Sequence, residues 1–589
     1  MGMQQEENRQ EEKRITGYPS IDKPWLKYYD SNEGQYVSDC SLYQNVYKHN
    51  KDYLSDIAIV YYGKKITYET LFKDTEACAK ALLEYGVKAD DCITMCTAVT
   101  PEAACLVLAC SKIGATANFI NPFFNREQLV DRINDTEAKL LFVMDKMWPC
   151  VEEVVCDTTL EYIVIISTAG VIKRIESIVT FTKHKFLQNI ISWKAFLKRG
   201  LNFSGQTEIE YKKNRGCIMV YSSGTTGASK GILLTNDGVN ATISHYYNQD
   251  FKYCREDTFY SLIPIWFSTG IVLSLMMPLC LGVTVIPEID FRKEKVIAGL
   301  KSYTPTMTLM ATSLWLEVAH ASSMKDVDLS NMKYPITGGE KVNVQDENEI
   351  TFFLKEHGCK VPLIKGYGMC ELGSTITSTS VAHSKEGTAG YPIKGTTVAA
   401  FDVVTNKEQK YGVRGEIRVD TPTRMECYYK NPEETKNFFY EDEKHTIWGR
   451  TGDIGYVDEE GFVFVEGRAT DSYETAEGKR VYLFDIEEVI LSNDSIAQCK
   501  AVELEVAGEK RTVVHMVIRQ NKKMDTKQLL KIIDKLCKEK LPREEVPIAY
   551  KIRDSLPVHP NGKRNVEALK ADKQGLLDKN GDELIINHV

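Results

Sequence analysis

The run from Tyr221 to Gly231, YSSGTTGASKG, is the feature that most constrains this chain. It lies between two apolar segments typical of strands, Cys217–Val220 and Ile232–Thr235. Its glycines allow tight turns that bring N–H groups close to an anion, and its hydroxyls and the ammonium of Lys230 can bind phosphate oxygens. Because Ser229 rather than glycine precedes Lys230, the spacing is not that of a Walker loop. Composition alone leaves two interpretations open, a phosphate-binding loop or a flexible turn.

Strand-like and helix-like segments alternate over residues 58 to 145, and the pattern returns between residues 217 and 365. Alternation of this kind predicts parallel sheets covered by helices, so the fold class is α/β. The apolar periods that carry this prediction are Ile57–Tyr62 and Cys92–Cys96 for strands, and Thr70–Tyr85 and Pro101–Ile113 for helices.

A chain of 589 residues exceeds one ordinary core and should divide into domains. The polar, charged start, residues 1–25, is expected to be a disordered lead-in. Residues 26–470 should form the large N-terminal domain, which ends in a small β-rich unit beyond Asp402. Residues 471–589 should form a small α+β domain, with helices at Asp485–Leu491 and Thr526–Lys540.

Charge and cysteine usage narrow the functional classes. The net charge of −9 argues against nucleic-acid binding, because no excess of lysine and arginine exists to neutralise phosphates. Sixteen cysteines occur without a CxxC pair, which favours reduced thiols in a cytosol over disulfides or a zinc site. The N-terminus lacks the apolar core of a secretory signal. We therefore expect a cytoplasmic protein.

Two segments leave a membrane question open. Residues 261–287 hold no charged side chain, but prolines and glycines divide them into strand- and helix-sized pieces, which favours a buried β–α–β unit over a membrane span. Residues 172–199 hold seven lysines and arginines against one acidic residue, interleaved with apolar residues. This segment is either a solvated helical insertion or a basic amphipathic helix that lies on an anionic membrane.

Further motifs precede and follow the glycine-rich loop in a fixed order, and together they carry a resemblance. The chain resembles the adenylate-forming superfamily, which comprises acyl- and aryl-CoA synthetases, peptide-synthetase adenylation domains and beetle luciferases. The likeness covers roughly residues 40 to 570 and implies a small mobile C-terminal domain hinged just after Gly467-Arg468. The motifs are Asn121-Pro122, Asp135–Lys139, Gly338-Gly339-Glu340, Gly366–Glu371, Arg450–Asp453, Gly467-Arg468 and Pro560–Lys563.

The resemblance implies a site for ATP. Thr225, Thr226 and Lys230 would contact the β- and γ-phosphates, Tyr367 would stack on the adenine, and Asp453 would accept the ribose hydroxyls. Arg468 would reinforce ribose and phosphate, with a structural salt bridge as the alternative. The residues implied to bind the nucleotide are Ser222, Ser223, Gly224, Thr225, Thr226, Lys230, Gly338, Gly339, Glu340, Gly366, Tyr367, Gly368, Asp453 and Arg468.

Three residues are implied in catalysis. Glu371, with Thr226, would hold Mg²⁺, which prefers a single carboxylate supplemented by water and phosphate oxygens. Lys563 would enter the site during adenylation and bridge the acyl oxygen to the nucleotide. The usual threonine before the glutamate is Cys370 here, which removes one donor to the α-phosphate.

The acid and the thiol acceptor are less determined. The charge-free stretch should form the acyl pocket, with Trp266, Phe267 and Gly270 as substrate contacts. No acidic residue is available there to hold an ammonium, so an apolar acid (fatty, branched or aryl) is favoured over an amino acid. The family's glycine loop, here ending at Gly478, lines the tunnel for the pantetheine of coenzyme A.

The hinge departs from the family pattern, with Thr470 at the pivot, Glu474 where lysine is usual, and one extra residue before Gly478. These departures leave three functions open. The first is an ATP-dependent carboxylate–CoA ligase, and the second is a stand-alone adenylating enzyme that loads the pantetheine of a separate carrier protein. The third is a catalytically poor scaffold that associates with membranes.

Overall fold

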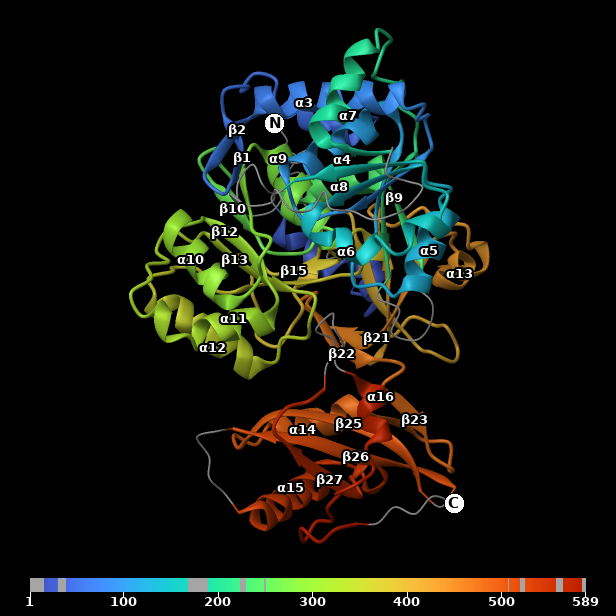
Figure 1. Ribbon diagram of the computed structural model, residues 1–589. Coiled ribbons are helices and arrows are strands. Elements are labelled where there is room, and N and C mark those ends of the chain that lie inside the picture. Colours follow the sequence, from blue (N-terminus) through green and yellow to red (C-terminus); the bar gives the residue numbers. More distant parts are fainter. Residues whose placement is uncertain are drawn as a thin grey trace, which may run out of the picture.

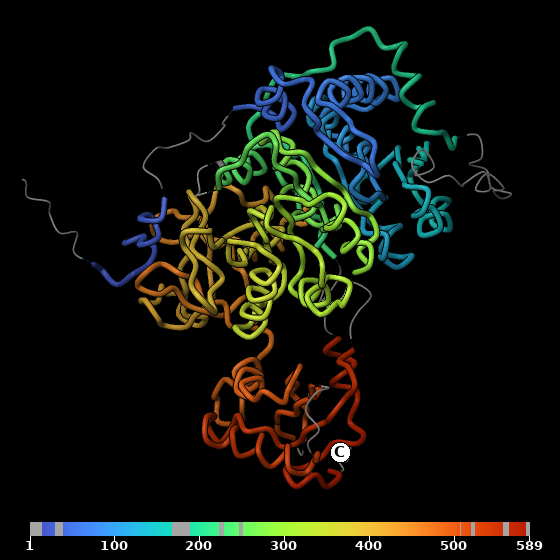
Figure 2. Tube along the Cα trace, turned by 90° about the vertical axis from the view of Figure 1, so that its left-hand side faces the viewer, coloured from blue at the N-terminus to red at the C-terminus, as the bar shows by residue number. Residues whose placement is uncertain are grey.

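The computed structural model describes residues 15–29, 39–167, 189–222, 229–247, 251–506, 508–519, 525–557 and 565–584. Three sheets and most of the helices form a large body, and a smaller lobe that carries the C-terminal elements lies at one end of it (Figures 1 and 2). The predicted α/β class with a large N-terminal part is confirmed.

The first sheet has nine strands in the order β16-β15-β14-β13-β12-β10-β11-β1-β2. Its central strands, β1 and β10 to β14, pair in parallel, and antiparallel pairs occur only towards its edges. The strands are β1 (Ile57–Tyr61), β2 (Lys64–Thr67), β10 (Thr258–Ser261), β11 (Thr284–Pro287), β12 (Met307–Met310), β13 (Tyr334–Gly338), β14 (Ile364–Tyr367), β15 (Thr377–Ser378) and β16 (Tyr391–Pro392).

The second sheet has eight strands in the order β19-β9-β8-β4-β3-β5-β6-β7. Strands β8 and β9 are antiparallel, and Tyr221 faces Gly231 in their register, so the glycine-rich loop connects the two strands of a hairpin. The strands are β3 (Cys92–Cys96), β4 (Thr116–Phe119), β5 (Leu140–Met144), β6 (Tyr162–Ile166), β7 (Ile190–Ser192), β8 (Gly216–Tyr221), β9 (Gly231–Thr235) and β19 (Cys427–Tyr428).

Helices fill the space between the two sheets and cover their outer faces (Figure 1). Local sequence explains α4, because the hydroxyl of Thr100 accepts from the N–H of Ala103, Pro101 occupies the first turn, and Gly114 ends the helix at φ +76°. The helices of this body include α2 (Leu42–Asn50), α3 (Tyr68–Glu84), α4 (Pro101–Ile113), α5 (Arg126–Asp135), α8 (Asn236–Tyr247), α10 (Lys293–Tyr303), α11 (Thr312–Ala319) and α12 (Val344–Glu356).

The charge-free stretch forms a buried strand–helix–strand unit, as the sequence predicts. A π-helix, η6 (Thr269–Met276), and α9 (Met277–Leu281) connect β10 to its parallel neighbour β11. The side chains of residues 270–277 are all buried. Of the helices that the structure describes, none is long and apolar enough to cross a membrane.

The third sheet joins the body to the C-terminal lobe. Its strands are β17 (Thr397–Phe401), β18 (Gly415–Asp420), β20 (Phe439–Glu441), β21 (Ile447–Val457) and β22 (Val463–Arg468), and α13 (Pro432–Phe438) precedes β20. The lobe contains β23 (Ser472–Glu474), β24 (Arg480–Tyr482), α14 (Leu483–Leu491), β25 (Ile496–Val506), β26 (Glu509–Ile518), α15 (Thr526–Lys540), β27 (Ala549–Arg553) and α16 (Val566–Ala571). The predicted domain boundary, 470/471, falls between β22 and β23.

Residues 1–25 were expected to be a disordered lead-in, but the described part of this segment contains packed structure before residue 26. Helix α1 (Pro19–Asp22) is followed by the 3₁₀ turn η1 (Pro24–Tyr28), and Trp25 is only 1% exposed. A Cβ atom on Gly461 would lie 2.8 Å from the backbone nitrogen of Trp25, so this segment packs closely on the third sheet.

The basic segment 172–199 is described only from residue 189 onward. There, α7 (Trp193–Arg199) places Phe196 and Trp193 against Phe142 of β5, with ring centroids 5.0 and 6.2 Å apart. The aromatic side chains of this helix therefore pack on the second sheet. The rest of the segment lies outside the described residues, and its predicted membrane contact stays a prediction.

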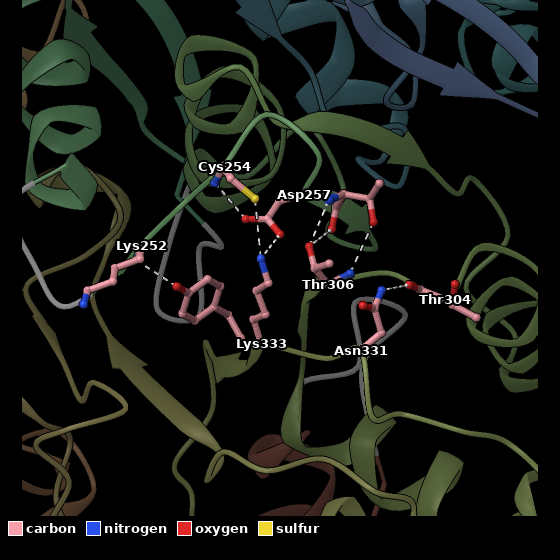
Figure 3. A network of polar contacts seen from close by, with 9 residues as sticks. Lys252, Cys254, Asp257, Thr304, Thr306, Asn331 and Lys333 are labelled. Carbon is pink, nitrogen blue, oxygen red and sulfur yellow. Dashed lines mark hydrogen bonds and ion pairs between the residues drawn. The ribbon is translucent and has the colours of Figure 1, made fainter.

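A polar network fixes the amino ends of β10, β12 and β13 (Figure 3). Lys333 donates to Asp257 at 2.6 Å, and the backbone N–H of Cys254 donates to the other carboxylate oxygen at 2.9 Å. The side chains of Thr258 and Thr306 each accept from the backbone N–H of the other residue. This network therefore fixes the register of β10, β12 and β13 at their amino ends, away from the carboxyl ends of the strands.

Substituting Lys333→Met should lower the free energy of unfolding of the large domain by about 2 kcal/mol, because it leaves the carboxylate of Asp257, which is 1% exposed, without its cation. Urea denaturation measures the change. Lys325→Met is the matched control, since Lys325 is exposed and forms no ion pair among the described residues. Equal effects of the two substitutions would contradict the stabilising role of the network.

Candidate active site

The carboxyl ends of β13 and β14 are formed by glycines, so the backbone there carries no side chains; this part of the chain is called the bare backbone. Gly338 and Gly366 are partners in the parallel register, and a Cβ atom on Gly338 would lie 2.8 Å from the carbonyl oxygen of Gly366. Gly339 follows with φ +83°, a conformation that favours glycine. No described atom lies within 4 Å of the place that a Cβ atom on Gly339 would take, so a flat ligand can approach the main chain there.

Tyr367 and Asp453 lie beside this backbone. The hydroxyl of Tyr367, at the end of β14, donates to Oδ2 of Asp453 at 2.5 Å. Arg468 faces Asp453 in the β21–β22 ladder, and its Nε lies 3.0 Å from Oδ1. Burial raises the pKa of Asp453, although Arg468 and Tyr367 act in the opposite direction. Three residues predicted from separate motifs thus meet around one carboxylate.

The alternative considered for Arg468, a structural salt bridge, is present. Its Nη1 also donates to the carbonyl oxygen of Thr451 at 2.9 Å. The side chain nevertheless remains 54% exposed, so other donors of its guanidinium still face solvent. The salt bridge and a ligand contact are therefore compatible.

A second cluster surrounds Glu371. This residue lies in the short turn η8 (Cys370–Leu372), its side chain is buried, and its Oε1 accepts from the hydroxyl of Tyr428 at 3.0 Å. The ammonium of Lys230 lies 4.8 Å from the centroid of the Tyr428 ring and forms an ion pair with Glu434 of α13. The sequence prediction found Glu371 and Lys230 but missed Tyr428 and Glu434.

Glu371 fits the role of a metal ligand. Among the described residues it forms no ion pair, and burial raises the pKa of its carboxyl group. A buried carboxylate whose donors are the neutral Tyr428 hydroxyl and its own backbone N–H leaves oxygen lone pairs for a hard cation such as Mg²⁺. No group of three or more His, Cys, Asp or Glu side chains in the described ranges is arranged to hold a metal, so the remaining ligands would come from substrate and water.

Only the base of the glycine-rich loop is described. The backbone N–H of Ser222 donates to the carbonyl oxygen of Lys230 at 2.9 Å, and the N–H of Lys230 donates to the Ser222 hydroxyl at 3.0 Å. These bonds close the loop below its tip. The other predicted residues of this loop and the predicted catalytic lysine lie outside the described residues, and their roles stay predictions: Ser223, Gly224, Thr225, Thr226 and Lys563.

Glu340 and Gly368 hold the surrounding turns. The backbone N–H of Ser313 donates to the carboxylate of Glu340 at 3.3 Å, which connects α11 to the turn after β13. A Cβ atom on Gly368 would lie 1.7 Å from the carbonyl oxygen of Ser374. Glycine is therefore needed at 368, and the close approach fixes the backbone that carries Tyr367.

A cavity of about 60 Å³ lies next to the bare backbone. Three residues of the η6–α9 helix line it, Thr269, Leu273 and Met277. The predicted substrate contacts, Trp266, Phe267 and Gly270, do not line this cavity. Trp266 packs against the ring of Phe123, and a Cβ atom on Gly270 would meet the Pro264 carbonyl oxygen at 1.9 Å. Of these three residues only Gly270 lies on the helix that supplies Thr269 and Leu273 to the cavity, and the role of all three in binding a substrate stays a prediction.

Gly478 lies in the C-terminal lobe, at the turn between β23 and β24, with φ +75°. Glu474 ends β23 on the same hairpin, and its Oε1 would lie 3.7 Å from a Cβ atom on Gly478. Two departures of the hinge, Glu474 and the extra residue before Gly478, thus lie on this hairpin, whereas Thr470 lies in the turn between β22 and β23.

Comparisons with known proteins identify the family to which the chain is similar. A family model described as "AMP-binding enzyme" matches residues 46–429. The long-chain-fatty-acid–CoA ligase of Bacillus subtilis (strain 168) is 24% identical and covers 86% of this chain and 90% of its own length. Luciferin 4-monooxygenase of Luciola mingrelica is 26% identical, with coverages of 92% and 96%.

Solved structures share the fold. ATP-bound MatB from Rhodopseudomonas palustris has a TM-score of 0.77 at 21% identity and covers 90% of this chain and 98% of its own. The anthranilate CoA ligase AuaEII in complex with anthranoyl-AMP has a TM-score of 0.75 at 19% identity, with coverages of 90% and 97%.

Proposed function

This chain belongs to the AMP-binding enzyme family, and on that basis we propose that it uses ATP to activate an apolar carboxylic acid. The products of this step are an acyl-AMP and pyrophosphate, and the acyl group then passes to coenzyme A. The convergence of Tyr367, Asp453 and Arg468 beside the bare backbone of Gly338 and Gly366 carries the proposal. Relatives named as CoA ligases for long-chain fatty acids, 4-coumarate and 2-succinylbenzoate support the ligase class but leave the acid open.

The nucleoside would bind at the first cluster. The Gly338-Gly339 backbone and the ring of Tyr367 suit the two faces of an adenine. The carboxylate of Asp453 suits the ribose hydroxyls, because each of its oxygens has a lone pair left after accepting from Tyr367 or Arg468. The exposed part of Arg468 adds a positive charge for ribose and phosphate oxygens.

The triphosphate would bind at the second cluster. Mg²⁺ held by Glu371, with Thr226 as a second predicted ligand, supplies charge neutralisation for the phosphates when bound. Lys230 would exchange Glu434 for phosphate oxygens. Since both partners of that ion pair are partly exposed, it contributes little to stability and yields readily to a more highly charged anion.

The chemistry requires two displacements. An oxygen of the substrate carboxylate attacks the α-phosphorus, and the bond from that phosphorus to the bridging oxygen breaks as pyrophosphate leaves. A thiolate then attacks the acyl carbon, and AMP leaves with the electrons of the carbon–oxygen bond. Lys563, as the predicted bridging cation, would stabilise the charge that develops in the first step.

One observation favours a carrier protein as the acceptor instead. The hairpin predicted to line the thiol tunnel presents Glu474, and coenzyme A brings more phosphate charge to such a hairpin than a carrier-bound pantetheine does. The two acceptors give different products and can be distinguished directly.

Carboxylate-dependent exchange of pyrophosphate into ATP tests the proposal. We expect exchange with at least one apolar acid, followed by formation of a CoA thioester; exchange without the thioester would favour the carrier-loading enzyme. Absence of exchange across a broad panel of acids would contradict the proposal and leave the scaffold.

Substituting Lys563→Ala should lower the exchange rate about 100-fold or more, because a cation at the developing charge is removed, while thioester formation from supplied acyl-AMP continues. Lys573→Ala is the matched control, since Lys573 lies in the same lobe and forms no ion pair among the described residues. An unchanged exchange rate in Lys563→Ala would exclude its predicted role.

Tyr428→Phe tests the cation site. The Tyr428 hydroxyl lowers the pKa of Glu371, and only the ionised carboxylate binds a cation, so affinity for Mg·ATP falls as the pH drops through that pKa. Removing the hydroxyl should move this fall to a higher pH. Isothermal calorimetry over a pH series measures the affinity for Mg·ATP, and Tyr429→Phe is the control. If the pH at which the affinity is half lost does not change in Tyr428→Phe, Glu371 is not the ligand.

A further inference from the structure

We infer that Thr451 is a positioning residue for the proposed nucleotide site: its hydroxyl and its carbonyl oxygen together hold the three groups that would bind the nucleoside. This inference rests on the proposed function and deepens it, because it concerns how the site selects a ribose. Thr451 belongs to the motif Arg450–Asp453, in which the resemblance implies a role for Asp453 alone. Thr451 is only 3% exposed, so it acts through its neighbours rather than by touching a ligand.

The hydroxyl of Thr451 joins the turn that carries Asp453 to the neighbouring strand β18. It donates to the carbonyl oxygen of Ile417 at 2.7 Å, and its oxygen accepts from the backbone N–H of Asp453 at 3.0 Å. The β18–β21 register shifts beside Ile417, and Gly452 has φ +68°, so the regular ladder is interrupted here. The hydroxyl therefore satisfies a buried backbone N–H at the point where the ladder does not.

The strand that anchors this hydroxyl is itself fixed. Ile417 is 0% exposed and lies between Glu416 and Arg418, whose side chains form an ion pair at 2.8 Å. The guanidinium of Arg418 also lies over two aromatic rings, with their centroids 4.8 and 4.9 Å away. A hydrogen bond to this strand therefore gives Thr451, and through it Asp453, a defined position.

The carbonyl oxygen of Thr451 orients Arg468. It accepts from Nη1 of the guanidinium at 2.9 Å, while Nε of the same group lies 3.0 Å from Oδ1 of Asp453. Two contacts to one rigid, planar group fix its orientation. The next carbonyl oxygen, that of Gly452, accepts from the N–H of Ala469 at 2.8 Å and so holds the chain after Arg468 as well. The main chain at Thr451 and Gly452 thus sets the position of the exposed donors of Arg468.

Tyr367 reaches the same point from the first sheet. Its hydroxyl donates to Oδ2 of Asp453 at 2.5 Å and is within hydrogen-bonding reach of the Thr451 side chain. Burial and the charge of Asp453 raise the pKa of the Tyr367 phenol, so at neutral pH the phenol is protonated and donates. Thr451 therefore contacts each of the three residues that would bind the nucleoside.

This arrangement matters for the two hydroxyls of a ribose. A carboxylate accepts from both hydroxyls only when each of its oxygens faces one of them, and Tyr367 and Arg468 already fix the plane of the Asp453 carboxylate. Without the Thr451 hydroxyl, the buried N–H of Asp453 loses its acceptor, and the main chain that carries the carboxylate is free to shift. The site then loses its preference for a ribose over a deoxyribose.

Thr451→Val tests the inference, because valine has nearly the same shape as threonine and lacks the hydroxyl. Isothermal calorimetry on the full chain measures Kd for Mg·ATP, Mg·2′-deoxy-ATP and Mg·3′-deoxy-ATP. We expect the wild-type protein to prefer ATP, and the ratio of the Kd values to fall about tenfold in Thr451→Val. Thr451→Ser keeps the hydroxyl and should keep the ratio. An unchanged ratio in Thr451→Val would overturn the inference; should this variant not fold, Thr451→Ala takes its place with the same expectation.

Thr421→Val is the matched control. Thr421 is 2% exposed and directly follows β18, and its hydroxyl bonds to those of Thr396 and Thr423 at 2.8 and 2.9 Å. The variant loses buried hydrogen bonds beside the same sheet, so urea denaturation should show a similar loss of stability while the ratio of Kd values stays unchanged. An equal fall of the ratio in Thr421→Val would mean that loosening the sheet is sufficient, and it would overturn the specific role of Thr451.

The kinetics of pyrophosphate exchange separate positioning from a defect in the chemical step. Thr451→Val should raise KM for ATP about tenfold and change kcat by less than about twofold, because the ribose is bound equally in the ground state and in the transition state. A fall in kcat at constant KM would contradict a positioning role.

The wild-type protein provides a test that does not depend on the folding of any variant. Equal affinity for ATP and both deoxy nucleotides would show that no carboxylate is positioned for the ribose; it would overturn this inference and leave the proposed function intact. Absence of both nucleotide binding and pyrophosphate exchange would overturn the inference and the proposed function together.

Discussion

The carboxylate of Asp453 is the point on which the site depends. It is buried, which by itself would favour its neutral form, and it stays in place because Tyr367 and Arg468 each bind one of its oxygens. Tyr367 ends a strand of the first sheet, whereas Asp453 and Arg468 belong to the third. One charge-assisted contact therefore joins two sheets at the place where an adenine and a ribose would meet, and losing it would loosen the fold and the site together.

Much of this arrangement follows from the sequence, and the failures have physical causes. Helix α15 has the bounds expected from its apolar period, and the charge-free stretch folds as the predicted strand–helix–strand unit. Tyr428 and Glu434 escaped prediction because they reach the site through the pairing of β19 with β9, a contact between strands almost 200 residues apart. Local periodicity carries no information about such pairings. The segment around Trp25 was missed for the same reason, since its burial depends on Gly461.

The second carboxylate, Glu371, shows why position alone does not define a metal ligand. Burial disfavours its charge, and the hydroxyl of Tyr428 compensates only in part because it brings a dipole and no cation. A bound cation would therefore stabilise the ionised form of the Glu371 carboxylate more than a further neutral donor would. Lys230 is close enough to contribute, but Glu434 already neutralises it. Glu371, the proposed cation ligand, and Lys230, the proposed phosphate ligand, would thus act together only when a polyphosphate displaces Glu434 from the lysine.

The attachment of the C-terminal lobe combines a firm anchor with a weak contact. Lys500 is mostly buried and pairs with Asp471 at 2.8 Å and with Glu487 at 3.0 Å, so the first residue after the predicted boundary is fixed within the lobe. Across the boundary, Arg414 of the body donates to both oxygens of Asp485 at 2.8 and 2.9 Å, in a pair that solvent reaches. Exposed ion pairs add little free energy and are screened by salt. Arg519 of the lobe also donates to Gln345 of the body at 3.0 Å. The predicted mobility of the lobe stays a prediction, with which these exposed contacts are compatible. A change of orientation would be needed for Lys563 and the Gly478 hairpin to act in turn on the same site, as the resemblance implies.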